Sequence, residues 1–481
     1  MTPLSLAEIA GAVGGRLVDA PDPAVVVTGS VEYDSRKIGP GGLFVALPGE
    51  HVDGHDFAAG AVDAGAAGVL AARPVGVPAV VVDDPVTAIG TLAHAVLDQL
   101  DATVVGVTGS SGKTSTKDLI GQLLAPLGPV VAPPGTLNNE LGFPYTALRA
   151  DEATRYLVLE YSARGLGDID YLCRIVAPRI AVVVNVGVAH LGEFGTVETI
   201  AQAKGELVEA LPADGIAVLN ADDPRVAAMA GRTRARVVTF GEAADADVRA
   251  EQVRLDERGR PGYRLVTGDG AVSVQLPLTG RHQVTNSLAA AAVAVACGGS
   301  LPGLSDAIGQ LTLVSERRMD VFDTTGGITV VDDSYNANPD SMAAALRALS
   351  SIGNRRRTWA VLGYMAELGD AERAGHEAVG RLAAQLGVDR LVVVEPSAGP
   401  IAAGADAVPD WGGDAVQVAD QAAAVAVLRD GLRPGDVVLV KGSRYRTWKV
   451  ADALRADRRP EPGTSTPDQR SDTGTVRGRA R

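Results

Sequence analysis

Cysteine and aromatic residues are scarce in this sequence, and its basic residues are outnumbered by its acidic ones. The two cysteines, Cys173 and Cys297, cannot form a disulfide framework, so we expect a reducing, cytosolic compartment. Aromatic residues make up 4% of the chain and hydrophobic residues 46%, which predicts cores built from Ala, Val and Leu. The net charge of −14 argues against nucleic acid or an anionic membrane as the main partner.

Long apolar runs are also missing. Alanine-rich stretches such as LAAAAVAVACGG are too short to span a bilayer. The opening stretch MTPLSLAEIAGAVGG contains Glu8 and has the pattern of a short amphipathic helix, without the basic start and continuous apolar core of a signal peptide. We therefore expect a soluble cytoplasmic protein that binds no membrane.

The 481 residues exceed what one core usually holds, so several domains are expected. Apolar strands alternate with helical stretches, which predicts parallel sheets covered by helices on both faces. We predict an α/β protein of three domains and a tail. These are a small N-terminal α/β domain (1–100), a central phosphate-loop domain with a parallel sheet (101–313), a C-terminal Rossmann-like domain (314–455) and a disordered tail (456–481).

Two stretches carry more detailed predictions. HDFAAGAVDAGAAGVL, residues 55–70, is rich in Ala and Gly and is predicted to form one helix. Residues 246–280 contain short strands in which polar and apolar residues alternate, separated by turns at ERGRPG and TGDGA. This pattern indicates an antiparallel patch beside the parallel sheet.

The stretch VVGVTGSSGKTSTKD, residues 104–118, has the pattern of a phosphate-binding loop. It passes from an apolar strand through a glycine-rich turn to a helix that begins at Lys113, so backbone N–H groups and the helix N-terminus can bind an anion. Lys113 can neutralise phosphate charge, and the Thr114 hydroxyl can bind magnesium. The loop is shorter than the usual one, because Val107 stands where a glycine is expected. An ordinary strand–helix turn is the alternative.

Polar residues follow the predicted strands downstream. Glu160 ends the strand YLVLE and His190 follows AVVVNVG, at the sheet edge where parallel sheets bind ligands. Together they could bind metal, although each alone could be structural. Lys204 lies on the buried-face spacing of its helix, so it points inward or extends along the domain edge to reach solvent.

Several motifs occur here in the order found in Mur ligases. They include TGSSGKTSTKD, GTLNNELGFP, NVGVAHLGEFGTVETIAQAKGEL, LNADDP, GRHQVTNSLAAAA, VDDSYNANPDS and VKGSR, preceded by YDSRKIGPGGLFVALPGEHVDGHDF. The resemblance covers about residues 30–450 and is strongest to the branch that adds D-alanyl-D-alanine. It departs from the family at Tyr161, after Glu160, and at Tyr364, where the family usually has an aspartate.

The resemblance implies a role for each matching residue. Lys113, Glu160, His190 and Lys204 would be catalytic, Lys204 as a carbamate, and Thr114, Glu160 and His190 would bind Mg²⁺. Asp34, Ser35, Arg36, Asn138 and Asn139 would bind the UDP-sugar substrate. ATP would be bound by Gly109, Ser110, Ser111, Gly112, Lys113, Thr114, Ser115, Asn286, Arg318, Asp333, Asn336 and Asn338.

The activity implied by the resemblance is ATP-dependent ligation, by a monomer, of D-alanyl-D-alanine to UDP-N-acetylmuramoyl-tripeptide through an acyl phosphate. The third residue of the tripeptide can be meso-diaminopimelate or lysine. A related amino-acid or poly-glutamate ligase, a nucleotide-dependent switch and an inactive paralogue are the alternatives. The DSRK and NANP segments and the retained Lys113, Glu160, His190 and Lys204 favour the ligase.

Overall fold

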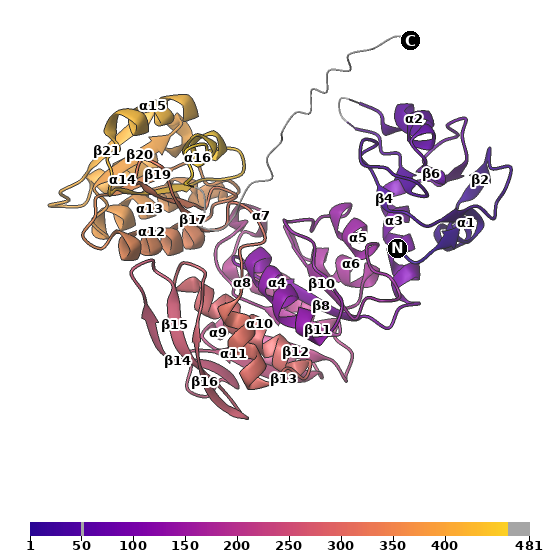
Figure 1. Ribbon diagram of the computed structural model, residues 1–481, viewed down its shortest axis with the longest axis horizontal. Helices are drawn as coiled ribbons and strands as arrows, with labels where there is room; N and C mark the ends of the chain where they lie inside the picture. The colour runs from indigo at the N-terminus through magenta and orange to yellow at the C-terminus, as the bar shows by residue number, and fades with distance from the viewer. Residues whose placement is uncertain (50–51, 460–481) are drawn as a thin grey trace, which may run out of the picture.

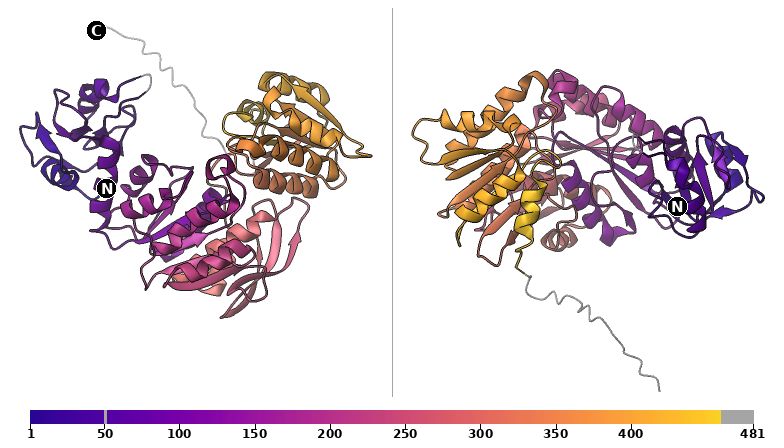
Figure 2. Two further views of the ribbon diagram at one scale, coloured as in Figure 1. Left: turned by 180° about the vertical axis from the view of Figure 1, so that it is seen from behind. Right: turned by 90° about the horizontal axis from the view of Figure 1, so that it is seen from above.

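The computed structural model describes residues 1–49 and 52–459, which form three lobes in chain order (Figure 1). The central lobe lies between the other two, and the molecule is bent around it (Figures 1 and 2). Each lobe contains one main sheet with parallel strands and packed helices, so the predicted α/β class is confirmed. Within the described residues, no helix is both long and apolar enough to cross a membrane.

The first lobe has a five-stranded sheet in the order β2-β7-β6-β5-β4, beside a two-stranded ribbon of β1 and β3. Its first helix is capped by Ser5 and Glu8 and ends at Gly14, whose φ of 64° is left-handed. The elements are β1 (Leu4–Ser5), α1 (Leu6–Val13), β2 (Arg16–Val18), β3 (Val26–Val27), β4 (Val31–Glu32), β5 (Leu43–Val45), α2 (Ala58–Asp63), β6 (Gly68–Ala71), β7 (Ala79–Val81) and α3 (Pro85–Leu97).

Residues 55–70 do not form the single helix predicted for them. The helix α2 ends at Asp63, and Gly65 adopts a left-handed φ of 107° that a helix does not allow. The chain then continues as the buried strand β6. The prediction was wrong because a short apolar run of small residues fits a buried strand as well as a helix.

The central lobe has a nine-stranded sheet in the order β16-β15-β14-β13-β12-β11-β8-β10-β9. Strands β8 to β14 pair in parallel with one another, whereas β15 pairs antiparallel with both β14 and β16, as predicted for residues 246–280. Its strands are β8 (Thr103–Thr108), β9 (Val130–Val131), β10 (Tyr156–Glu160), β11 (Ile180–Val183), β12 (Ile216–Asn220), β13 (Arg236–Gly241), β14 (Val248–Leu255), β15 (Pro261–Thr267) and β16 (Gly270–Gln275).

Helices cover this sheet on both faces, and α10 packs against α4, the helix that follows the phosphate loop. Ala289 to Ala292 and Ala294 of α10 are fully buried, and their small side chains let helices approach closely. The helices are α4 (Lys113–Leu124), α5 (Gly142–Ala147), α6 (Asp168–Ile175), α7 (Leu191–Phe194), α8 (Val197–Glu209), α9 (Pro224–Ala227), α10 (His282–Ala296) and α11 (Leu301–Gly309).

The third lobe has a six-stranded sheet in the order β17-β18-β22-β19-β20-β21, parallel except for β17. Its strands are β17 (Asp320–Asp323), β18 (Thr329–Asp332), β19 (Thr358–Leu362), β20 (Arg390–Val394), β21 (Asp414–Val418) and β22 (Val437–Lys441). Its helices are α12 (Pro339–Gly353), α13 (Glu372–Gln385), α14 (Pro400–Asp406), α15 (Gln421–Gly431) and α16 (Trp448–Arg455).

Each main sheet lies inside one of the three predicted domains, while the boundaries at 100/101 and 313/314 stay predictions. The tail predicted for 456–481 begins within the described residues. There, the Arg459 N–H donates to the Asp323 carbonyl at 2.8 Å, next to β17. Residues 460–481 lie outside the described residues.

Tyr161, one of the two departures from the family pattern, is a core residue. Its side chain is fully buried, and its hydroxyl donates to the Val176 carbonyl at 2.6 Å. Its ring packs edge-on against Phe143 with the centroids 4.8 Å apart. A Cβ at Gly106, on the neighbouring strand β8, would lie 2.8 Å from the ring. Gly106 therefore makes room for Tyr161, whose role is packing.

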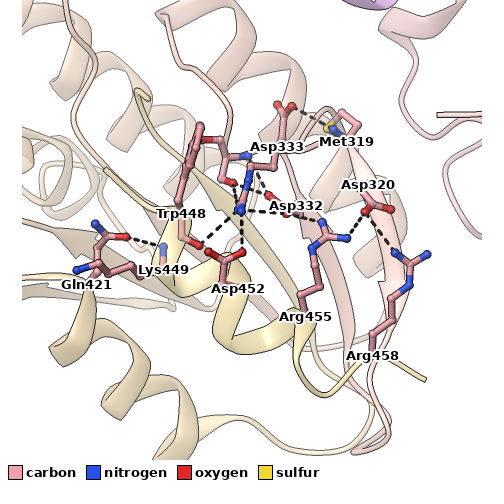
Figure 3. Close-up of polar contacts among 12 residues, drawn as sticks. Met319, Asp320, Asp332, Asp333, Gln421, Trp448, Lys449, Asp452, Arg455 and Arg458 are labelled. Carbon is pink, nitrogen blue, oxygen red and sulfur yellow. Dashed lines mark hydrogen bonds and ion pairs between the residues drawn. The ribbon is translucent and has the colours of Figure 1, made fainter. Parts of the chain in front are cut away.

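An ionic network joins the last helix of the third lobe to its first strands (Figure 3). Arg455 of α16 donates to Asp320 at 2.7 Å and to the fully buried Asp332 at 2.6 Å. Arg317 donates to Asp452, also on α16, at 2.6 Å. The ion pairs with Arg455 and Arg317 offset the cost of burying the Asp332 carboxylate.

We predict that Asp332→Asn lowers the free energy of unfolding of the third lobe by about 3 kcal/mol, because the change leaves a guanidinium facing a neutral group. Urea denaturation followed by tryptophan fluorescence measures this lobe, since Trp359, Trp411 and Trp448 are the only tryptophans of the chain. The control Asp430→Asn, at an exposed position, should change stability by less than about 0.5 kcal/mol. Equal effects of the two changes would contradict the prediction.

Candidate active site

A cleft of about 1020 Å³ opens between the central and third lobes, and Tyr33 reaches it from the first. The carboxyl ends of β8, β10 and β11 face it from one side, and those of β18, β19 and β22 from the other. Asp34, Ser35, Arg36, Gly109 and Lys204 do not line it. The predicted residues that line it are Ser110, Ser111, Gly112, Lys113, Thr114, Ser115, Asn138, Asn139, Glu160, His190, Asn286, Arg318, Asp333, Asn336 and Asn338.

The loop between β8 and α4 has a fixed shape. Gly112 has a left-handed φ of 78°, and a Cβ there would lie 2.6 Å from the Asn286 side-chain oxygen, so only glycine fits. The Ser111 N–H donates to Asn185 Oδ1 at 2.9 Å, and Lys113 Nζ donates to the Gly109 carbonyl at 2.7 Å. The N-terminus of α4 therefore faces the cleft, ready to bind an anion.

Two lysines lie beside the loop, of which Lys113 is half-buried and Lys204 is buried. Burial lowers the pKa of Lys113; the Glu160 carboxylate opposes this effect and the Arg318 charge adds to it. Burial holds the pKa of Lys204 well below its ordinary value, and repulsion by Lys113 lowers it further. Lys204 is 3% exposed, so it points inward as predicted and does not extend to solvent. The two amines are close together, and anions bound here would stabilise them.

Glu160 and Thr114 fit a cation that also binds phosphate oxygens. Glu160 is buried; its Oε2 accepts from Asn138 at 3.2 Å, and its Oε1 has no hydrogen-bond partner. Thr114 Oγ1 lies 3.0 Å from Thr136 Oγ1. The described part of the chain has no cluster of three or more His, Cys, Asp or Glu side chains that could hold a metal by themselves. A metal here would therefore share its shell with oxygens of a ligand.

His190 lies across the cleft boundary from a residue that the sequence did not point to. Its backbone is left-handed, with φ of 59°, and its Nδ1 lies within hydrogen-bond distance of the Glu367 carboxylate of the third lobe. The hydrogen bond from His190 lowers the pKa of the Glu367 carboxyl, burial opposes this, and Arg164 and Arg444 lower it further. His190 and Glu160 line the same cleft, as predicted from their strand ends.

The third lobe reaches the phosphate loop directly. Arg318 donates to Thr114 Oγ1 at 3.2 Å, and its guanidinium lies over the Tyr335 ring, 4.1 Å from the centroid. Asn338 donates to the Ser110 carbonyl at 3.4 Å. These residues lie far from the loop in sequence, and the structure brings them to it.

Asp333 and Asn336 also line the cleft, but both are bonded within their own lobe. Lys441, at the end of β22, forms an ion pair with the Asp333 carboxylate and donates to the Asn336 carbonyl at 3.0 Å. Lys441 was part of the VKGSR motif, although its partner could not be predicted from it. Asp333 also accepts from the Met319 N–H, beside Arg318 (Figure 3).

The residues predicted for the sugar end are divided. Asn138 and Asn139 line the cleft, and Asn139 accepts from the Gly142 N–H at 2.8 Å at the start of α5. Asp34 and Arg36 form a local ion pair at 2.9 Å in the first lobe, where the Arg36 side chain is 87% exposed. Their proximity to a substrate stays a prediction.

Three segments of the chain match models of one protein family. Residues 28–97 match the Mur ligase family, catalytic domain; residues 107–294 match the Mur ligase middle domain; and residues 317–444 match the Mur ligase, glutamate ligase domain. Together these segments span most of the described chain, and they follow the order of the three lobes.

Named relatives align over nearly the whole length. The UDP-N-acetylmuramoyl-tripeptide--D-alanyl-D-alanine ligase of Mycobacterium tuberculosis (strain ATCC 25618 / H37Rv) is 52% identical over 503 residues, which cover 95% of this chain and 98% of that protein. The ligase of the same name from Escherichia coli (strain K12) is 36% identical over 450 residues, with 92% and 96% covered.

Solved structures agree with these alignments. A crystal structure of MurF from Acinetobacter baumannii superposes with a TM-score of 0.84 at 31% identity, covering 95% of this chain and 99% of that one. The MurF ligase from Thermotoga maritima in complex with ADP gives 0.77 at 30% identity, with 90% and 98% covered. The chain therefore belongs to the Mur ligase family.

Proposed function

We propose that this chain joins D-alanyl-D-alanine to UDP-N-acetylmuramoyl-tripeptide at the expense of ATP, giving the pentapeptide precursor of peptidoglycan. The observation that carries the proposal is the phosphate loop, with the half-buried Lys113 and the unpartnered Glu160 oxygen beside it, at a cleft completed by the third lobe. Full-length relatives with this activity in their names, and a related structure with ADP bound, support it.

The chemistry requires two steps. The terminal carboxylate of the tripeptide attacks the γ-phosphorus of ATP, which forms an acyl phosphate and releases ADP. The amine of the dipeptide then attacks the acyl carbon, the amide bond forms, and phosphate and a proton leave. Lys113, the loop N–H groups and Arg318 lower the repulsion between the carboxylate and the phosphates in the first step.

The proposal includes Mg²⁺, for which the cleft offers suitable ligands. Thr114 and Glu160 would hold one ion, and the ring nitrogen of His190 that does not face Glu367 is available for a second. Magnesium would neutralise phosphate charge there. The unpartnered Glu160 oxygen supports this assignment, because a buried carboxylate oxygen without a donor needs a cation.

We also propose that Lys204 carries a carbamate in the active enzyme. A neutral lysine amine attacks CO₂, which forms an N–C bond and releases a proton. The lowered pKa of Lys204 favours the neutral amine that this reaction requires, and the product replaces a buried cation with an anion beside Lys113.

The remaining assignments extend the proposal beyond the cleft. The first lobe, 1–100, would bind the UDP-sugar with Asp34, Ser35 and Arg36, while 101–313 would bind ATP and 314–455 would close the site. The exposed Arg36 guanidinium supports the first assignment. We propose that the protein acts as a cytoplasmic monomer, where its nucleotide-linked substrates are made.

The proposed activity requires both D-alanyl-D-alanine and UDP-N-acetylmuramoyl-tripeptide for ATP turnover. Wild-type protein should release one ADP and one phosphate for each pentapeptide formed, as measured by coupled ADP release and mass spectrometry. Lys113→Ala should lower ligation at least about 100-fold, because it removes the cation nearest the transferred phosphate. The control Lys449→Ala, at an exposed position, should not. ATP hydrolysis independent of the dipeptide would instead indicate a nucleotide switch.

We predict that replacing Lys204 lowers the activity and raises the stability of the protein. In bicarbonate-free buffer without ligands, Lys204→Met should raise the free energy of unfolding by about 1 kcal/mol or more at pH 7, because each unit of lowered pKa costs about 1.4 kcal/mol. Ligation should fall at least about 100-fold.

The pH dependence of the free energy of unfolding shows whether the lowered pKa of Lys204 causes the stabilisation by Lys204→Met. Between the lowered pKa of Lys204 and its ordinary value of 10.5, the unfolded chain binds a proton that the folded chain lacks, so wild-type stability rises with pH. The advantage of Lys204→Met, measured by urea denaturation from pH 6 to 9, should therefore shrink as the pH rises. A constant advantage would show that packing alone is responsible.

A further inference from the structure

We infer that Glu367 and Arg444 bind the two charged ends of the incoming dipeptide, the carboxylate of Glu367 its ammonium and the guanidinium of Arg444 its carboxylate. The inference rests on the proposed function and assigns the acceptor site within the same cleft. Both residues line the cleft from the third lobe, opposite the phosphate loop.

The two residues lie on adjacent loops that are bonded to each other. Strands β19 and β22 are parallel neighbours, with Leu362 paired to Lys441, and each ends just before one of these loops. The Ser443 N–H donates to the Tyr364 carbonyl at 2.9 Å, and the Ser443 hydroxyl accepts from the Ala366 N–H at 2.9 Å. Neighbouring strands lie about 4.8 Å apart and an extended dipeptide spans about 7 Å, so two adjacent loops can hold both ends of one dipeptide.

No carboxylate among the described residues lies within ion-pair distance of Arg444, whose charge acts on Glu367 at longer range. Its guanidinium donates to the Tyr335 hydroxyl at 3.0 Å and lies over that ring, 5.1 Å from the centroid. Arg446, two residues further on in the same loop, is instead paired with Glu395 at 2.8 Å. Arg444 therefore presents a positive charge to the cleft that a carboxylate ligand can neutralise.

Glu367, whose side chain is 33% exposed, is the more accessible of the two acids that line the cleft from the third lobe. The other acid that lines the cleft from this lobe, Asp333, is tied to the buried Lys441. Glu367 adopts a left-handed φ of 64°, an unfavourable conformation for a non-glycine residue that places its carboxylate at the lobe boundary. There it contacts His190 and, at 3.2 Å, Arg164, whose side chain is 73% exposed. An exposed ion pair of this kind is weak, so an ammonium can replace Arg164.

The orientation of the dipeptide follows from these contacts. Because Glu367 meets His190 of the central lobe, an ammonium bound there faces the side of the cleft that holds the phosphate loop. Transfer of one ammonium proton to the Glu367 carboxylate leaves a neutral amine directed toward the acyl phosphate, and the dipeptide carboxylate is held by the neighbouring loop.

The test for Arg444 compares D-alanyl-D-alanine with its C-terminal amide in steady-state ligation with saturating ATP and UDP-muramoyl-tripeptide. Wild type should prefer the free carboxylate by at least tenfold in kcat/KM, and Arg444→Ala should reduce this preference to less than about threefold. Arg444→Lys should restore part of it, and the matched change Arg446→Ala should preserve it. Unchanged KM values for ATP and tripeptide would show that the variants fold.

The test for Glu367 separates substrate binding from contact between the lobes. Glu367→Gln should raise the KM for D-alanyl-D-alanine at least tenfold, whereas Arg164→Ala should leave that KM equal or lower it, since it removes a competitor of the ammonium. A similar rise in both variants, or an unchanged preference in Arg444→Ala, would overturn the inference while wild-type ligation stands. Absence of ligation by wild type would instead refute the proposed function, and the inference with it.

Discussion

The desolvation of two lysine amines beside the phosphate loop is the constraint on which the site depends. Lys204 is buried and Lys113 is half-buried, and burial lowers the pKa of each. Protonation of such amines is costly unless anions bind beside them. The cleft is therefore complementary to phosphates, to carboxylates and to a carbamate. The Glu160 oxygen that has no hydrogen-bond partner is a site where a metal ion can bind and neutralise part of the ligand charge.

The third lobe contributes the positive charge of Arg318 to the phosphate loop, and the first residues of this lobe are held in a fixed position. Arg317 bonds to α16 through Asp452, and the next residue, Arg318, reaches Thr114 on the loop. The buried pair of Asp332 with Arg455 holds the strands behind it. A network distant from the reacting groups thus sets the position of a cation at the loop, and the lobe also covers the cleft, where an acyl phosphate must be kept from water.

The features of the site that could be predicted from the sequence are those formed by one continuous stretch of chain or by neighbouring strand ends at one sheet edge. The phosphate loop is one continuous stretch, and Glu160 could be placed because the carboxyl ends of parallel strands meet at one edge. Glu367 could not be found in this way, since its contact with His190 depends on how two lobes pack. The helix predicted across Gly65 failed for a local reason, because a left-handed glycine can end a helix without changing the apolar pattern.

The departure at Tyr364 shows how a residue outside the cleft can shape it. Its hydroxyl donates to Glu372 at 2.6 Å, and its ring stacks on His376 with the centroids 5.1 Å apart. His376 is fully buried and accepts from the Met365 N–H, so the first residues after β19 are held from both sides. The strained Glu367 follows directly and extends from this support toward the central lobe. Tyr364 therefore anchors the loop that leads from β19 to Glu367.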